Sequence, residues 1–133
     1  MGILFRMDRN VTAEQVAALF RSVHWMSGDF PEELACALRG AAVLVTAWDK
    51  KRLVGLCEIL TDGGMTAYLN YLLVHPDYQG RKIGKKLAEL ALSRLGGFRR
   101  IILLADHGKE PFYEQFGFRC DDHSQGMALL IRE

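Results

Sequence analysis

Apolar residues recur along the chain with helical and strand spacing, and these patterns predict alternating helices and strands. Residues 3–7 predict a short first strand. Thr12 and Gln15 form a capping-box pattern in front of apolar residues spaced three to four apart, which predicts a helix. A second short helix is expected to run from Pro31 through Leu38, with Gly40 stopping it.

Three segments rich in β-branched and aromatic residues follow these helices. They span residues 41–48, 52–62 and 66–74. Short turns rich in Asp, Lys and Gly separate them, so the three segments are expected to form a meander of neighbouring strands.

A helix is then expected over residues 80–95, because the apolar residues return to helical spacing before a pair of glycines. Residues 99–105 are nearly all apolar, which predicts a strand that is buried on both faces. Residues 109–116 predict a short helix with Gly117 at its C-cap, and residues 127–133 predict a final strand.

The predicted order is β-α-α-β-β-β-α-β-α-β, which indicates a single α/β (α+β) domain over residues 1–133 with a mixed central sheet. The two strands that flank the third helix are expected to be parallel and joined by a right-handed crossover. No repeat or linker interrupts the pattern.

Composition narrows the class of protein. The chain has 133 residues, 50% hydrophobic and 25% charged, with a net charge of +1. These values favour an ordered domain over a disordered chain or a nucleic-acid binder. The cysteines are odd in number and widely separated, so we expect buried free thiols in a reducing compartment and no metal site: Cys36, Cys57 and Cys120. Without a leader pattern or a long apolar run, a cytoplasmic location without membrane contact is expected.

The segment LLVHPDYQGRKIGKKL, residues 72–87, carries the strongest candidate chemistry. It reads as a strand, a loop and the start of a helix, and a helix N-terminus attracts anions through its unpaired N–H groups and its dipole. Gly80 and Gly84 would let the backbone approach a phosphate closely. Basic side chains surround the opening: Arg81, Lys82, Lys85 and Lys86. The alternative is an ordinary turn with a solvated basic rim.

A second candidate segment, LLADHGKEPFYEQFGF, follows the later apolar strand. Two neighbouring parallel strands, each followed by a helix, create a crevice at their carboxyl ends, where ligands of α/β sheets usually bind. Tyr113 is expected on the helix that borders this crevice. The alternative is that Tyr113 only packs against its aromatic neighbours, Phe112, Phe116 and Phe118.

Taken together, these motifs resemble the GCN5-related N-acetyltransferase (GNAT) family. VHPDYQGRKIGKKL is similar to the family's acetyl-CoA loop, and FYEQFGF is similar to its fourth-helix signature. Lys82 stands where the loop more often has its first glycine, and it would suit the loop if its φ is negative. Asp106 stands where many relatives carry Asn. RLVG…TDG together with Asp106 resembles a subgroup that includes the plant serotonin-type N-acetyltransferases.

The resemblance implies acetyl-CoA as co-substrate, with no metal. Main-chain groups of the strand would pair with the pantetheine arm, loop N–H groups would hold the pyrophosphate, and a bulge in the strand would turn an N–H toward the thioester. The implied acetyl-CoA contacts are Leu72, Leu73, Val74, Gln79, Gly80, Arg81, Lys82, Ile83, Gly84, Lys85, Asp106 and Phe112.

The resemblance also implies direct attack of an amine in a ternary complex, with Tyr113 protonating the leaving thiolate. Relatives often carry a Glu or His that acts as the general base on the strand before the loop, at positions held here by Tyr68 and Asn70. Glu58 on the adjacent strand is therefore the candidate base, unless it is a solvated strand residue. Trp25, Tyr68 and Asn70 are candidates for the acceptor site.

Three functions fit this reading. The first is an acetyl-CoA-dependent N-acetyltransferase that acts on a primary amine of a small molecule or peptide. The second is a protein lysine or N-terminal acetyltransferase, and the third is a non-catalytic acyl-CoA-binding sensor. The expected partners are acetyl-CoA and an amine acceptor, with no nucleic acid and no membrane. A homodimer is a further option, because dimers are common in the family.

Overall fold

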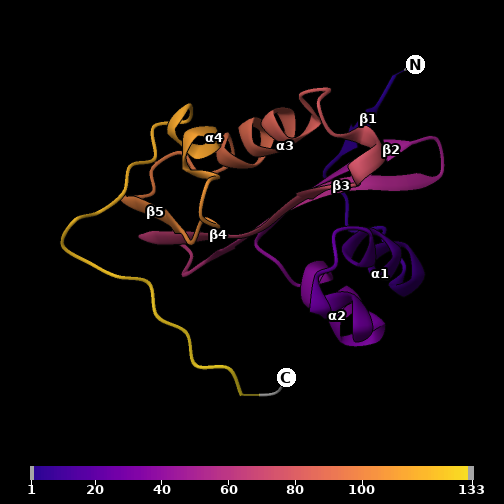
Figure 1. The fold of residues 1–133 in the computed structure, drawn as a ribbon, viewed down its shortest axis with the longest axis horizontal. Coiled ribbons are helices and arrows are strands. Elements are labelled where there is room, and N and C mark those ends of the chain that lie inside the picture. The colour runs from indigo at the N-terminus through magenta and orange to yellow at the C-terminus, as the bar shows by residue number, and fades with distance from the viewer. Residues whose placement is uncertain (1, 132–133) are drawn as a thin grey trace. The chain divides into compact units, whose positions relative to one another are not determined.

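The computed structural model describes residues 2–131, which separate into two compact units. The first unit extends to Ile102 and contains most of the regular elements, and the second unit begins at Leu103. Figure 1 shows the element order. Each unit is described by itself.

The first helix, α1 (Ala13–Ser22), confirms the predicted capping box. The Gln15 backbone N–H donates to Thr12 Oγ1 at 3.1 Å, and the Thr12 N–H donates to Gln15 Oε1 at 3.0 Å. These bonds satisfy amide groups that a helix start otherwise leaves unpaired. The apolar stripe of α1 is buried: Val16, Ala17, Leu19 and Phe20.

The second helix, α2 (Pro31–Arg39), begins at the predicted residue and extends one residue beyond the predicted Leu38, with Gly40 at its C-cap. A short 3-10 helix, η1 (Met26–Asp29), connects it to α1. Its glycine, Gly28, packs closely on α1, because an added Cβ would lie 3.1 Å from the Ala17 carbonyl oxygen. The two helices therefore form one layer.

Five strands form a sheet in the order β1-β2-β3-β4-β5. The strands are β1 (Leu4–Arg6), β2 (Val43–Asp49), β3 (Arg52–Thr61), β4 (Thr66–Val74) and β5 (Arg100–Leu103). β1 pairs with β2, β2 with β3, and β3 with β4, each antiparallel, which confirms the predicted meander. The start of β5 is tied to the β3–β4 turn, where the Met65 carbonyl accepts from the N–H groups of Arg99 and Arg100.

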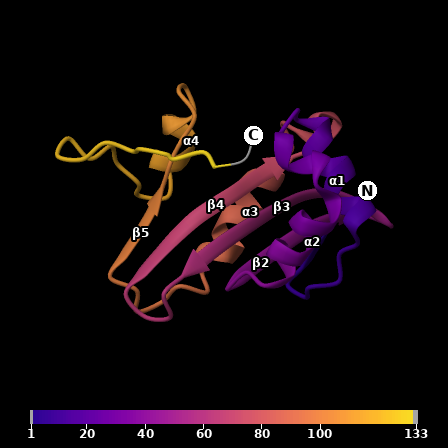
Figure 2. The same cartoon turned by 90° about the horizontal axis from the view of Figure 1, so that it is seen from below.

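Helices cover both faces of this sheet within the first unit. Figures 1 and 2 show α1 and α2 on one side and α3 (Ile83–Leu92) on the other. Gly55 in β3 allows α3 to approach, because a Cβ there would lie 3.0 Å from Leu87 Cδ1 and 3.1 Å from the Leu73 carbonyl oxygen. The core under α1 and α2 includes Phe20, Leu38, Leu44, Leu56 and Leu73.

The third helix is shorter than the predicted range of 80–95. It begins at Ile83 and ends at Leu92. Gly80 and Lys82 have φ values of +83° and +64°, which lie outside the right-handed helical region. The residues before Ile83 therefore form a loop.

The apolar segment at residues 99–105 is not buried on both faces, contrary to the prediction. Only Arg100–Leu103 form a strand, and Ile102 is 40% exposed. The strand β5 ends the strand order, so it has a strand partner on one side only. An apolar run predicts a strand, but its position in the sheet decides its burial.

The second unit contains the predicted short helix, α4 (Glu110–Glu114). Gly117 follows it with φ +98°, and its N–H donates to the Glu114 carbonyl at 3.0 Å. The predicted final strand is wrong for residues 127–131, which have no regular secondary structure, and residues 132–133 lie outside the described residues. An apolar run becomes a strand only where its backbone groups find a partner. Here Met127 is 89% exposed and Ile131 is 84% exposed.

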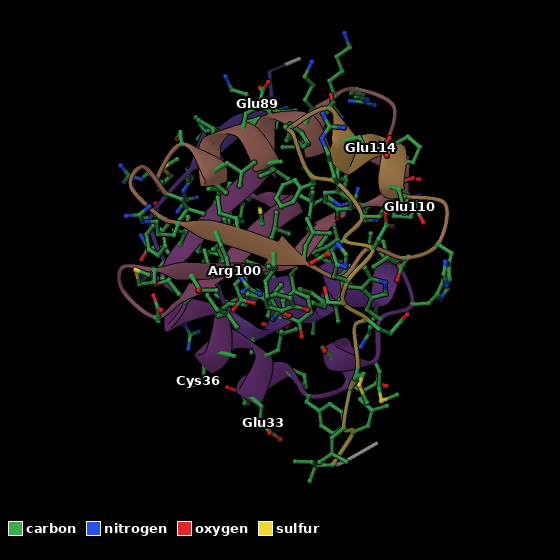
Figure 3. All side chains as sticks on the ribbon, turned by 90° about the vertical axis from the view of Figure 1, so that its left-hand side faces the viewer. Glu33, Cys36, Glu89, Arg100, Glu110 and Glu114 are labelled. Carbon is green, nitrogen blue, oxygen red and sulfur yellow. The ribbon has the colours of Figure 1, made fainter. Side chains whose placement is uncertain are left out.

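The cysteines were expected to be buried, and this is wrong for two of the three. Cys57 is buried in β3, and burial foremost, then the Glu58 charge, raises the pKa of its thiol to about 12. Cys36 and Cys120 are exposed free thiols. Figure 3 shows Cys36 and Glu33 on the outer side of α2. The buried side of this helix is formed by Leu34, Ala35 and Leu38.

No helix within residues 2–131 has both the length and the apolar character needed to cross a bilayer.

Candidate functional site

The loop between β4 and α3 has a backbone shaped for an anion. After β4 comes a 3-10 turn, η2 (Pro76–Tyr78), and then Gln79 is extended with φ −71° and ψ 157°. Gly80 and Lys82 follow in left-handed conformations, and Ile83 opens α3. Lys82 is the N-cap but makes no side-chain capping bond, so no capping side chain satisfies the first N–H groups of α3. Such amides and the helix dipole favour a bound phosphate.

The backbone conformation of Lys82 differs from the expected one. A negative φ was expected there, but φ is +64° and ψ is 20°. The chain must reverse sharply between Gly80 and Ile83, and a left-handed residue makes that reversal. This conformation normally favours glycine, since a Cβ costs about 1–2 kcal/mol there.

We expect Lys82→Gly to raise the free energy of unfolding by about 0.5–1 kcal/mol, because the relieved strain outweighs the added entropy of the unfolded chain. The matched control is Lys85→Gly inside α3, which is expected to lower it by about 1 kcal/mol. Urea denaturation of both variants measures the difference. An equal decrease in the free energy of unfolding of both variants would show that the Lys82 backbone is not strained.

Tyr78 anchors this loop to the β2–β3 turn, a contact that sequence reasoning missed. Its hydroxyl donates to Asp49 Oδ2 at 2.5 Å, and this bond is the main cause that raises the pKa of Tyr78. The Arg81 guanidinium lies 5.0 Å from the centre of the ring, and that of Arg52 lies 5.6 Å away. Gln79 adds a second tie, because its Nε2 donates to the Val74 carbonyl at 2.9 Å. The loop is therefore tied to the β2–β3 turn through Tyr78 and to the end of β4 through Gln79.

A β-bulge distorts β4 shortly before the loop. Glu58 is paired with Tyr71, but the next residue, Ile59, is paired with Leu69, so Asn70 is the extra residue. A bulge was expected in this strand from the family resemblance, and it lies at Asn70. Bulges locally increase twist and redirect side chains, and they are frequent beside active sites.

Glu58 is the one carboxylate buried beside this bulge among the described residues. Only 2% of the residue is exposed, and Asn70 Nδ2 donates to Glu58 Oε1 at 2.8 Å. Burial raises the pKa of Glu58, and the hydrogen bond from Asn70 opposes this shift. The alternative of a solvated strand residue is therefore excluded. A buried carboxyl with a raised pKa is a candidate for proton transfer.

An aromatic cluster borders Glu58 on the face that carries α1 and α2. Tyr71, the strand partner of Glu58, shares a hydrogen bond of 3.0 Å between its hydroxyl and Ser27 Oγ. The Phe20 ring meets the Tyr71 ring edge-on at 4.9 Å and the Trp25 ring at 5.9 Å. Trp25 is therefore half-buried in a wall of packed rings. Sequence reasoning assigned the segment HWMSGDF to the acceptor site without singling out Ser27, and it missed Tyr71, because only the fold brings η1 next to β4.

The other predicted residues of the first unit divide between the faces of the sheet. Tyr68 pairs with Leu60, two residues after Glu58, so strand alternation places it on the face of Glu58. Burial is the main cause that raises the pKa of Tyr68. Leu72 pairs with Cys57 and therefore lies on the opposite face, toward α3, while Leu73 packs in the core under α1 and α2.

The remaining predicted residues belong to the second unit. Tyr113 is half-buried on α4, and its ring meets the Phe112 ring at 5.1 Å and the Phe118 ring at 6.1 Å, both edge-on. Asp106 is exposed, and its carbonyl accepts from the Lys109 N–H at 2.9 Å. The aromatic packing that was the alternative interpretation of Tyr113 is thus present, and the role in catalysis stays a prediction. Among the described residues, no group of three metal-binding side chains gathers.

Comparison with known proteins yields consistent matches. A family model described as an acetyltransferase (GNAT) domain matches residues 9–129. An uncharacterized N-acetyltransferase of Pyropia yezoensis is 26% identical, over 98% of this chain and 78% of its own length. Serotonin N-acetyltransferase of Mesocricetus auratus is 38% identical over 60% of this chain and 41% of its own. A GNAT family acetyltransferase structure from Streptococcus pneumoniae has a TM-score of 0.85 at 28% identity, covering 99% of this chain and all of that one.

Proposed function

Because the chain belongs to the GNAT acetyltransferase family, we propose that it transfers the acetyl group of acetyl-CoA to a primary amine of a small molecule or peptide. The observation that carries this proposal is the loop at residues 79–82. Its left-handed Gly80 and Lys82 lead into a helix whose N-cap supplies no side-chain bond. Unsatisfied amides at a helix N-terminus fit a pyrophosphate.

The chain's own groups fit acetyl-CoA in the following roles. The N–H groups from Gln79 to Lys85 would hold the pyrophosphate, with Arg81 and Lys82 adding positive charge. Main-chain groups at residues 72–74 would hold the pantetheine arm as an added strand is held. Asp106 and Phe112 are further proposed contacts of acetyl-CoA, as the family resemblance implies. When bound, acetyl-CoA supplies an acyl group on a thiolate leaving group.

Glu58 is the proposed general base. An alkylammonium with a pKa near 10 must lose a proton before it attacks a carbonyl. Burial raises the pKa of Glu58, which makes its carboxylate a stronger base than an exposed carboxylate. Asn70 donates to Oε1 and so orients the carboxylate, which receives the proton directly or through one water. Trp25, Tyr68 and Tyr71 would border the acceptor amine.

Tyr113 is the proposed general acid for the departing thiolate. We expect Tyr113→Phe to lower kcat by about tenfold to a hundredfold, because a thiolate with a pKa near 8–9 leaves fairly well without help. The ring remains, so its packing on Phe112 and Phe118 and the melting temperature should be retained. Steady-state kinetics with a saturating amine measure the effect. A variant with the wild-type rate would remove Tyr113 from the mechanism.

The function is tested by two measurements on the wild-type protein. A titration with acetyl-CoA is expected to raise the melting temperature by mass action. Release of CoA thiol is then followed with a panel of arylalkylamines, diamines and lysine peptides. A folded protein that shows no shift would overturn the proposal. A shift without thiol release for any amine would indicate the acyl-CoA sensor, and release with lysine peptides alone would indicate the protein acetyltransferase.

A further inference from the structure

A groove rich in positive charge is lined by residues outside the loop at residues 79–82. Two adjoining cavities of about 620 Å³ and 830 Å³ share Thr12, Gln15 and Lys51 in their linings, between the start of α1 and the β2–β3 turn. The smaller cavity, called the basic groove below, is lined by five cationic side chains and no carboxylate: Arg6, Arg9, Arg39, Lys50 and Lys51. Since the net charge of the whole chain is only +1, this is a local concentration.

Most of this charge is not neutralised. Arg6 Nε lies 3.0 Å from Asp8 Oδ2, and within residues 2–131 no carboxylate is within ion-pair distance of the other four groove cations. Arg9 donates to the carbonyls of Arg39 and Ala42 at 3.1 Å and 3.3 Å. Arg39 Nη2 donates to the Val11 carbonyl at 2.9 Å. These bonds to carbonyls orient each guanidinium but leave its charge and other donors for a ligand.

The arrangement suits an extended ligand with several negative charges. Two amide donors at the start of α1, those of Thr12 and Gln15, are already used by the capping box, which leaves fewer backbone donors for a single phosphate. The cations come from three separate places: the segment before α1, the end of α2, and the β2–β3 turn. Carboxylates spaced along a peptide can pair with such dispersed cations, and guanidinium groups bind carboxylates bidentately.

Nucleic acid fits this surface less well. Proteins that hold single strands combine positive charge with exposed aromatic rings on which bases stack. The aromatic residue of the groove, Trp48, is only 3% exposed, and the Arg6 guanidinium covers its ring at 4.5 Å. Its indole N–H is also engaged, donating to Thr46 Oγ1 at 2.7 Å.

We propose that the basic groove binds an acidic segment of a partner polypeptide. This site is distinct from the acetyl-CoA loop, because none of the loop residues 79–85 lines either cavity. The inference does not depend on the proposed acetyltransferase activity.

The test uses a fluorescent octaglutamate peptide and fluorescence anisotropy with the full chain. Lys50→Gln/Lys51→Gln is expected to weaken binding by about tenfold, because it removes two exposed ion-pairing groups. Both lysines are exposed at the β2–β3 turn, so the fold should be retained. The matched control is Arg94→Gln/Arg99→Gln, which removes the same charge from exposed positions outside the groove.

Several results would overturn the proposal. Wild-type protein that does not bind the peptide is one, and equal weakening in the groove and control variants is another, since it indicates attraction to net charge alone. Displacement by inorganic phosphate at the peptide's own concentration would indicate a single-anion site. Tighter binding of a labelled octauridylate would assign the groove to RNA. Displacement by acetyl-CoA would show that the peptide binds at the β4–α3 loop and not in the basic groove.

Discussion

Glu58→Gln is expected to lower kcat by about a hundredfold to ten-thousandfold, the range usual for loss of a general base. The amide keeps the shape of the side chain and can still bond to Asn70, but it cannot accept a proton from an ammonium group. Binding of acetyl-CoA should be unchanged, because the β4–α3 loop is untouched. The matched control is Glu89→Gln on the outer side of α3, which Figure 3 shows, and it should keep the wild-type rate.

The same variant should change the pH dependence of both activity and stability. Burial raises the pKa of Glu58 above the ordinary value of 4.5, so wild-type activity should rise with pH through this raised pKa, and the variant should lack this limb. A carboxyl with a raised pKa in the folded state stabilises the fold below 4.5, and this contribution is lost as pH rises through the raised value. The melting temperature of Glu58→Gln should therefore fall less over this range than that of wild type. Identical kinetics and melting curves would show that Glu58 is not the base.

Gly84→Asp is expected to abolish detectable binding of acetyl-CoA. Gly84 is the second residue of α3, where the loop N–H groups would face the pyrophosphate, and a carboxylate there would repel it and occupy its space. The helix should still form, because a negative charge at a helix N-terminus is favourable by about 0.3–1 kcal/mol. At an acetyl-CoA concentration of 100 times Kd, wild type should gain about 2.7 kcal/mol of stability, and the variant should gain none.

The control for this experiment is Gly96→Asp. It introduces the same side chain just after α3, at an exposed glycine where an added Cβ meets nothing within 4 Å. Thermal-shift titration and calorimetry should show wild-type binding in this variant. If Gly84→Asp bound acetyl-CoA as tightly as Gly96→Asp does, the pyrophosphate would not lie at the start of α3. If wild type itself failed to bind acetyl-CoA, the proposed function would be wrong, and the position of the pyrophosphate would not be at issue.

Elements that depend on neighbouring residues could be predicted from the sequence. The start of α1 is set by the two reciprocal hydrogen bonds of the Thr12–Gln15 capping box. The helix α2 begins at Pro31 and stops before Gly40. The strand at residues 66–74 was predicted to the residue, since turns flank a β-rich run. The β4–α3 loop was also recognisable, because its glycines and cations lie close together in the sequence. Local patterns therefore located the candidate phosphate site.

Features that depend on distant partners appeared only in the tertiary structure. The burial of Glu58 and its bond to Asn70 require β3 to pair with β4 across a bulge that no local pattern marks. The contact between Tyr78 and Asp49 joins residues that are far apart in the chain. For the same reason, the exposure of Cys36 and of the apolar residues 127–131 was missed. Local propensity selects helix, strand or turn, but burial, side-chain partners and the pKa of a carboxyl depend on which distant surfaces pack together.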